Sequence, residues 1–357
     1  MSFGNETNQT SQQISLEERV ANVVAVLPIV MTGLFGNALV LAVVAKGLNR
    51  RQRSKSNAFV FLLAICDLVF LLSSAVPNVA RYISGSRSWL FPEWTCPFLV
   101  FLSFASANAG CIVIACFSTV RLLAVRKPHC FVSHLTFKTQ MSILLPTMFI
   151  PIAYSSIWLI NIGVKRGECT FIQNRGSYLL IFVADFAAFF AFPLMITCIA
   201  AIYLIRIIAT STNHMPRRAR DGHIATKIMV TVAVTFAITC LPYRTIVIWN
   251  SLKGTNASTV WLTHVCRWLW YANSAINPIC YSFCSEQFRR GCFVLLAIDC
   301  LLPKAKSQPG SAEPNKTEPT RPEDQVVLSD FISDYVLIKA KRPSSKIRKS
   351  TGEDNTI

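Results

Sequence analysis

Long runs of apolar residues constrain this chain more than any other feature. They alternate with short polar stretches, and charged residues make up only 15% of the chain. Soluble domains carry about 25% charged residues. Because only a helix satisfies its own backbone hydrogen bonds in lipid, about 20 apolar residues in a row predict a membrane-spanning helix. The sequence therefore predicts an all-α membrane protein.

The fold class expected is a seven-transmembrane helix bundle with a short amphipathic interfacial helix. The predicted spans are residues 20–45, 57–80, 97–122, 141–163, 178–208, 224–249 and 260–284. The domain organisation expected is an extracellular glycosylated N-terminus (1–19), the bundle (20–285), the interfacial helix (286–300) and a cytoplasmic tail (301–357). Pro, Ser, Lys and Glu dominate the tail, and such a composition predicts disorder.

The charges in the loops predict the orientation in the plasma membrane. The net charge is +17, and the loops after the first, third and fifth spans are the more basic ones. By the positive-inside rule the N-terminus lies outside and the tail inside. The sequons at Asn5, Asn8 and Asn256 then fall outside, where glycosylation is expected. These loops also explain the basic charge, so no nucleic-acid partner is expected.

Cysteines at two loops and near the interfacial helix predict modifications. Cys96 and Cys169 lie in loops expected outside, an oxidising place, so a disulfide between them is expected. Two free thiols are the alternative. Cys292 and Cys300 are candidate palmitoylation sites, with unmodified thiols as the alternative. No Cys/His cluster predicts a metal site, and no nucleophile–base pair or phosphate loop predicts an enzyme.

Polar residues in the middle of the spans predict a buried cluster. Asp67 lies in the second span, Asn37 in the first, and Asn273, Ser274 and Asn277 in the seventh. An ionisable side chain at this depth is costly and needs a partner or a function. The cluster is either a structural hydrogen-bonded network or a hydrated Na+ site, because oxygen ligands suit a hard cation. Apart from that Na+, no cofactor is expected.

Residues spread over the spans resemble those of rhodopsin-like (class A) G-protein-coupled receptors. They are Asn37, the LAxxD at Asp67, Cys96 with Cys169, Arg121, Pro193, Leu241-Pro242 and Asn277-Pro278-Ile279-Cys280-Tyr281. The resemblance covers residues 20–295, and the seventh span is most similar to peptide receptors of the galanin, allatostatin and somatostatin kind. It implies a receptor that signals to heterotrimeric G proteins. The switch residues it implies are Arg121, Asn277, Pro278 and Tyr281.

Several positions depart from the pattern of that family. The acid-Arg-aromatic triplet reads Val120-Arg121-Leu122, and Cys240 stands in place of the aromatic residue before Leu241. The missing acid normally restrains the arginine, so raised basal signalling is expected. The rival expectation is weak coupling, or a non-signalling decoy or scaffold receptor of the same fold. A transporter or channel is a further alternative, although no inverted repeat or selectivity loop is evident.

The resemblance also implies a ligand pocket in the outer halves of the spans. Ser103 stands where amine receptors carry Asp, which argues against an amine ligand, and Tyr271 stands where opsins carry the retinal lysine, which argues against an opsin. Arg244 either pairs with Asp185 or, like Arg267, binds an acidic group of the ligand, because guanidinium matches carboxylate geometry. The expected pocket residues are Ser103, Asp185, Cys240, Arg244, Arg267 and Tyr271.

Other residues near the two faces have less specific roles. Trp261, Trp268 and Trp270 are expected in the interface belt of the membrane. Arg81 and other outer-loop cations would steer an acidic peptide, or are simply solvated. Serines of the tail, once phosphorylated, would bind an arrestin-like partner, or are solvated. The basic run in the tail is expected to contact anionic membrane lipid.

Overall fold

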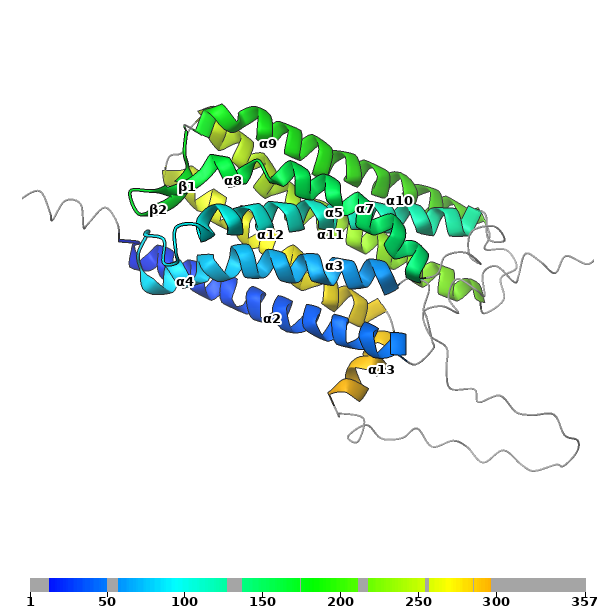
Figure 1. Cartoon of the computed structure of the whole chain (residues 1–357). Helices are drawn as coiled ribbons and strands as arrows, with labels where there is room; N and C mark the ends of the chain where they lie inside the picture. The colour runs from blue at the N-terminus through cyan, green and yellow to red at the C-terminus, as the bar shows by residue number, and fades with distance from the viewer. Residues whose placement is uncertain are drawn as a thin grey trace, which may run out of the picture.

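Seven long helical segments lie side by side in the structure, a computed structural model, with a short helix at one end (Figure 1). The structure describes residues 13–49, 57–126, 137–173, 175–210, 218–253, 257–284 and 286–296. Within them, the first five segments are each long and apolar enough to cross a membrane. The predicted seven-helix bundle is confirmed.

The segments follow the predicted spans in order, each extended by a few residues. They are α2 (Leu16–Asn49); α3 (Asn57–Phe70) with η1 (Leu71–Ala75) and α4 (Val76–Ser84); α5 (Thr95–Arg126); α7 (Phe137–Ser155) with α8 (Trp158–Asn161); α9 (Leu179–Phe186) with η3 (Ala187–Ala191) and α10 (Phe192–Thr210); α11 (Arg218–Lys253); and α12 (Ala257–Cys284). A 3-10 turn, η2 (Arg175–Tyr178), leads into α9. The short helix is α13 (Glu286–Leu295), which packs on α2 and α12.

A β-hairpin departs from the all-α prediction. Strand β1 (Ile162–Lys165) pairs antiparallel with β2 (Glu168–Phe171), with Val164 opposite Cys169. Arg166 and Gly167 join the strands, and both have positive φ, 54° and 82°. Two-residue hairpin turns with positive φ at both positions match the right-handed twist of the strands. The hairpin marks one end of the bundle, which we call the hairpin end (Figure 1).

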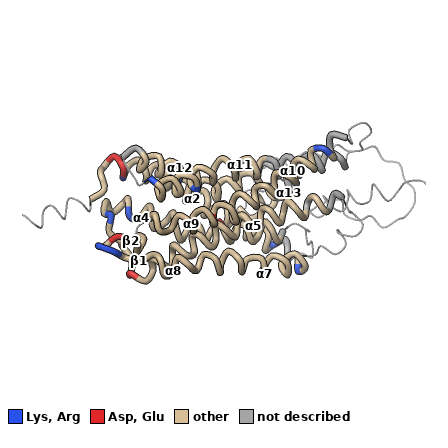
Figure 2. The backbone as a smooth tube through the Cα atoms, turned by 90° about the horizontal axis from the view of Figure 1, so that it is seen from above, with Lys and Arg blue, Asp and Glu red and all other residues tan. Residues whose placement is uncertain are grey.

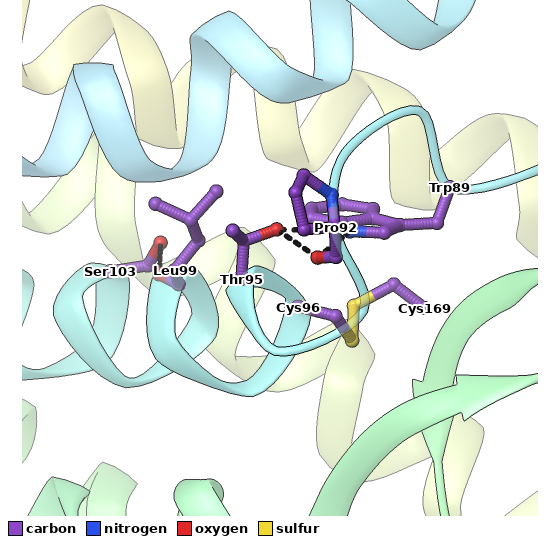
Figure 3. The surroundings of a disulfide bond; sticks show 7 residues. All are labelled: Trp89, Pro92, Thr95, Cys96, Leu99, Ser103 and Cys169. Carbon is purple, nitrogen blue, oxygen red and sulfur yellow. Dashed lines mark hydrogen bonds between the residues drawn. A yellow bond between two sulfur atoms is a disulfide. The ribbon is translucent and has the colours of Figure 1, made fainter.

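The hairpin is attached to the bundle by the disulfide between Cys96 and Cys169, so the predicted pairing is confirmed. Beside it the Trp89 indole N–H donates to the Pro92 carbonyl and to the Thr95 hydroxyl, at 3.2 and 3.1 Å (Figure 3). This first loop and the hairpin are thus both held at the start of α5.

A buried aromatic cluster supports the hairpin from below. Trp158 is fully buried, and its ring lies 4.9 Å from that of Phe104 and 5.4 Å from that of Phe182. Phe171 of β2 completes the cluster, with its ring 5.8 Å from that of Phe182. The disulfide therefore joins α5 to a hairpin that is itself packed against the aromatic cluster.

Two segments contain a wide, π-helical turn ahead of a proline. Turn η1 precedes Pro77 and turn η3 precedes Pro193. Because proline has no N–H, the carbonyl four residues earlier loses its helical partner, and the chain accommodates this by widening one turn. In η1 the wide turn presents Ser73 and Ser74 to different neighbouring helices.

Charge is distributed unequally between the two ends. Among the coloured residues of Figure 2, acidic ones gather at the hairpin end, together with several basic ones, whereas the opposite end carries basic ones. Helix α2 begins at the hairpin end and α13 lies at the opposite end (Figure 1). An odd number of crossings, as predicted, produces this arrangement.

Candidate functional site

The polar network predicted around Asp67 forms at the centre of the bundle. The Asp67 carboxylate accepts hydrogen bonds from the Ser274 hydroxyl at 2.7 Å and from the Asn277 amide at 2.8 Å. The Asn37 amide donates to the Ser274 carbonyl at 2.9 Å, which joins α2 to α12. All four residues are buried. The network therefore ties α2, α3 and α12 together in the apolar interior.

Close packing of α2 on α12 makes this network possible. A Cβ on Gly36 would lie 2.8 Å from the Pro278 Cβ, and one on Gly33 would lie 3.5 Å from Ala275. Small residues let helix backbones approach closely in membranes. Asn37 follows Gly36 directly, so its amide reaches the backbone of α12.

The prediction for Asn273 was wrong in detail. Its side-chain oxygen accepts a hydrogen bond from Thr239 of α11 at 3.1 Å and does not bond Asp67. Asn277, predicted both in this cluster and as a switch residue, donates to the second carboxylate oxygen. Helix α12 packs on both α11 and α2, so its polar residues are divided between two neighbours.

A second polar cluster is a closed triad of Asn108, Asp185 and Arg244. The Arg244 guanidinium forms an ion pair with the Asp185 carboxylate and donates to the Asn108 oxygen at 2.7 Å. The Asn108 amide donates to the other Asp185 oxygen at 2.6 Å. Each side chain thus bonds the other two, and the triad connects α5, α9 and α11.

The triad decides between the two roles predicted for Arg244. Only 7% of Arg244 is exposed, and its guanidinium carbon lies 5.9 Å from the centre of the Phe190 ring. The predicted pairing with Asp185 is confirmed: both Nη groups of Arg244 are used within the triad, and its buried Nε has no hydrogen-bond partner. Asn108 was missed in the sequence. The signal was available, because Asn108 is a polar residue inside an apolar run, as Asn37 is.

Arg267 is placed differently. It is half-buried on α12, and its guanidinium lies 6.0 Å from the centre of the Tyr243 ring. In the described part of the chain, no carboxylate lies within ion-pair distance of it. Tyr82, Tyr243 and Tyr271 are its electrostatic neighbours. Of the two arginines expected to meet a ligand, Arg267 is the one that keeps its charge available.

The interface-belt role predicted for Trp270 was wrong. Trp270 is 6% exposed and stacks on Tyr243, with ring centroids 4.3 Å apart and planes 13° apart. Its ring also lies 4.5 Å from that of Phe70. Trp268 points elsewhere, donating from its indole to Asn22 at 2.9 Å, and Trp261 remains 37% exposed. Trp270 therefore fills the core beside Arg267.

The other three predicted pocket residues, Ser103, Tyr271 and Cys240, are buried inside the bundle. The Ser103 hydroxyl donates to Ser73 at 3.1 Å, and the Tyr271 hydroxyl lies 3.2 Å from that of Ser74. Both bonds use the wide turn η1. Cys240 is buried next to the core and adjoins Thr239. These three residues line the interior rather than an open surface.

At the hairpin end a chain of polar contacts joins α2, α4 and α12. The His264 ring contacts Glu18 through Nε2 at 3.1 Å and Tyr82 through Nδ1 at 3.4 Å. Glu18 also pairs with Arg87 at 3.3 Å. Arg19 donates to the carbonyls of Tyr82 and Ile83 at the end of α4. No pattern in the sequence predicted this arrangement.

At the end of the bundle opposite the hairpin, the structure describes some of the predicted switch residues but not the side chain of Arg121. Arg121 lies on α5, but its side chain is outside the described residues, as are Asn5, Asn8, Asn256 and Cys300. Val120 packs against the apolar core. The Tyr281 ring lies 6.3 Å from that of Phe288 on α13. Cys292 of α13 is buried, which raises the pKa of its thiol.

Comparisons with known proteins agree with this geometry. A family model described as 7 transmembrane receptor (rhodopsin family) matches residues 36–281. The thyrotropin-releasing hormone receptor of Bos taurus is 26% identical over 327 residues, which cover 80% of this chain and 81% of that receptor. The allatostatin-A receptor of Bombyx mori is 28% identical over 316 residues, 81% and 84% of the two chains. The histamine H2 receptor of Canis lupus familiaris is 27% identical over 308 residues, 79% and 82% of the two chains.

Proposed function

Since this chain belongs to the rhodopsin family of seven-transmembrane receptors, we propose that it is a cell-surface receptor that binds a peptide carrying an acidic group and signals to heterotrimeric G proteins. It is a receptor and not an enzyme. The hairpin end faces outward in this proposal, because the Cys96–Cys169 disulfide requires an oxidising compartment. The N-terminus is then extracellular and α13 lies on the cytoplasmic side.

The observation that carries the ligand proposal is the contrast between the two arginines. Arg244 is paired within its triad, whereas Arg267 is half-buried with Tyr82, Tyr243 and Tyr271 among its neighbours and no ion-pair partner in the described residues. A guanidinium held by aromatic rings is suited to bind a carboxylate of the ligand. Two of the similar receptors are named for peptides, and one for histamine. Ser103, at the position of the amine-binding Asp, supports a peptide rather than an amine.

Charge reversal at Arg267 is expected to abolish activation by an acidic peptide agonist. A Glu at this position would repel the carboxylate that the Arg attracts. The measurement is agonist-stimulated guanine-nucleotide exchange in membranes from expressing cells, with a panel of acidic peptides and neuropeptides. Arg87→Glu is the matched control, because Arg87 is exposed and pairs with Glu18. Unchanged potency in Arg267→Glu would remove Arg267 from the binding set.

Ligand-free nucleotide exchange is expected to be raised, because Val120 cannot restrain Arg121 with a charge. Val120→Asp supplies the missing acid and should lower this basal exchange severalfold, whereas Val120→Asn, of the same size, should not. Arg121→Ala sets the zero level. Wild-type exchange equal to that of Arg121→Ala would instead support the second candidate function, a decoy or scaffold receptor. Cys240, which replaces the aromatic residue usual in the family, also favours that candidate.

The same nucleotide-exchange assay tests whether Asp67 binds Na+. The carboxylate accepts two hydrogen bonds and has lone pairs left, and the Ser274 hydroxyl adjoins it. Both groups would suit Na+, which would favour the network seen here and lower basal exchange. Replacing Na+ by choline should then raise exchange in the wild type and leave Asp67→Asn unchanged. If nucleotide exchange in the wild type and in Asp67→Asn were equally unaffected by Na+, the network around Asp67 would have only a structural role.

A further inference from the structure

Two neighbouring side chains of α4 hold buried hydrogen-bond donors that have no acceptor. Arg81 donates from Nη2 to Asn78 Oδ1 at 3.2 Å, so the two side chains are in contact. Asn78 Nδ2 and Arg81 Nε are both buried and have no hydrogen-bond partner. Leaving a buried donor unsatisfied costs about 1–3 kcal/mol, and more for a charged group. Such groups in a native structure call for an explanation, and an acceptor supplied by a ligand is one.

The charges at this end leave Arg81 without an internal carboxylate. Glu18 is already shared between His264 and Arg87. Arg19 is satisfied by backbone carbonyls. In the described residues, no acid lies within ion-pair distance of Arg81 or Arg267, and both are half-buried. Unlike Arg19, whose guanidinium is bonded to two backbone carbonyls, these two guanidinium groups have neither a carboxylate nor a backbone carbonyl partner among the hydrogen bonds of the described residues.

Arg81 of α4 and Arg267 of α12 have Tyr82 and His264 as common neighbours. The Arg81 guanidinium lies 5.2 Å from the centre of the Tyr82 ring, and Tyr82 is also an electrostatic neighbour of Arg267. His264 interacts electrostatically with both arginines, and its ring lies 6.0 Å from that of Tyr82. Both charges therefore belong to one neighbourhood, around Tyr82 and His264.

We propose that the Asn78–Arg81 pair is a second anion subsite, so that the ligand presents two carboxylates, one to Arg81 and one to Arg267. The Asn78 amide and the Arg81 guanidinium supply the two unused donors, which a carboxylate accepts with its two oxygens. A peptide ending in an acidic residue has this chemistry, with its side-chain and C-terminal carboxylates close together. This inference rests on the proposed function, and assigns α4 a part in ligand selection.

The test uses four peptides of identical sequence that differ only at the last residue. They end in Glu or Gln, as a free acid or an amide, and so carry two, one or no carboxylates there. The readout is the melting temperature of the purified full-length receptor in detergent, because a ligand that binds only the folded state raises it. The diacid peptide is expected to give the largest rise in the wild type.

Arg81→Gln and Arg267→Gln are expected to lose recognition of different carboxylates. Each should weaken binding of the diacid about tenfold to a hundredfold, the value of one hydrogen-bonded charge pair. In each variant, the rise in melting temperature should no longer depend on one of the two carboxylates of the peptide. For one variant this should be the side-chain carboxylate, and for the other the C-terminal carboxylate. Arg87→Gln, an exposed arginine, is the control and should match the wild type. An Arg81→Gln receptor that responds to all four peptides as the wild type does would overturn the proposal.

Asn78→Asp provides an independent test, in case Arg81→Gln fails to fold. The new carboxylate beside Arg81 imitates that of the ligand. It should raise the melting temperature of the ligand-free receptor and remove the preference for the diacid, whereas Asn78→Leu should weaken that preference without raising the melting temperature. An unchanged melting temperature with the preference intact would contradict the subsite. If only the Gln-amide peptide stimulates nucleotide exchange, this inference fails while a peptide receptor remains.

Discussion

Replacing Arg244 by methionine is expected to lower the free energy of unfolding of the receptor by about 3–5 kcal/mol. The substitution leaves the Asp185 carboxylate buried, with only the Asn108 amide to donate to it. An isolated charge in the interior loses its hydration without a compensating ion pair, which explains the large cost. The midpoint of heat-induced unfolding of the purified full-length receptor measures the effect.

A double variant separates the lost charge pair from lost packing. Arg244→Met combined with Asp185→Leu removes both charges, and replacing a whole buried pair by apolar residues is often neutral or stabilising. Most of the stability should therefore return. Arg87→Met is the control, because that exposed pair with Glu18 contributes at most about 1 kcal/mol. A double variant as unstable as the single one would show that the ion pair is not the cause.

Loss of the disulfide is the second large effect expected. Cys96 and Cys169 are 73 residues apart, and closing a loop of this length stabilises the folded state by about 4 kcal/mol in the chain-entropy model. For this protein the value is an upper estimate, because helices stay formed when a membrane protein loses its tertiary structure. Cys96→Ser should lower the unfolding midpoint and release the hairpin from α5.

Reduction of the wild-type protein gives the matched comparison. A mild reductant should shift the wild-type midpoint toward that of Cys96→Ser, and should leave Cys96→Ser combined with Cys169→Ser unchanged. The packing of Trp158 and its aromatic neighbours against the hairpin does not depend on the disulfide, so part of the hairpin contacts should persist in all three. If the reductant lowered all midpoints equally, some other thiol chemistry would be responsible.

Several features of the fold were predictable because they depend on local composition. The spans follow from apolar runs of bilayer length, and the helices lie where those runs lie. Cys96 and Cys169 were predicted to pair from their two loops alone. Asp67 was placed in a polar network because a carboxylate inside a span needs donors, whichever helices supply them.

The arrangement of side chains around each helix was not predictable in this way. A polar residue inside a span must find a partner, but the rotation of its helix against its neighbours decides which partner it meets. Asn273 and Asn277 lie on one helix, yet the first bonds α11 and the second bonds Asp67. Trp270 was assigned to the membrane interface on its position alone, whereas in the structure it is buried and stacks on Tyr243 in the core.

The sequence by itself determined that this chain crosses a membrane seven times, that an acid is buried in the second span, and that two arginines lie near one end. Tertiary structure alone decided which arginine is neutralised, because Asn108, Asp185 and Arg244 come from three helices far apart in the chain. It also decided that Arg81 and Arg267 share one region. Hydrophobicity determines whether a segment enters lipid, but only contacts between helices determine which charge is left for a ligand.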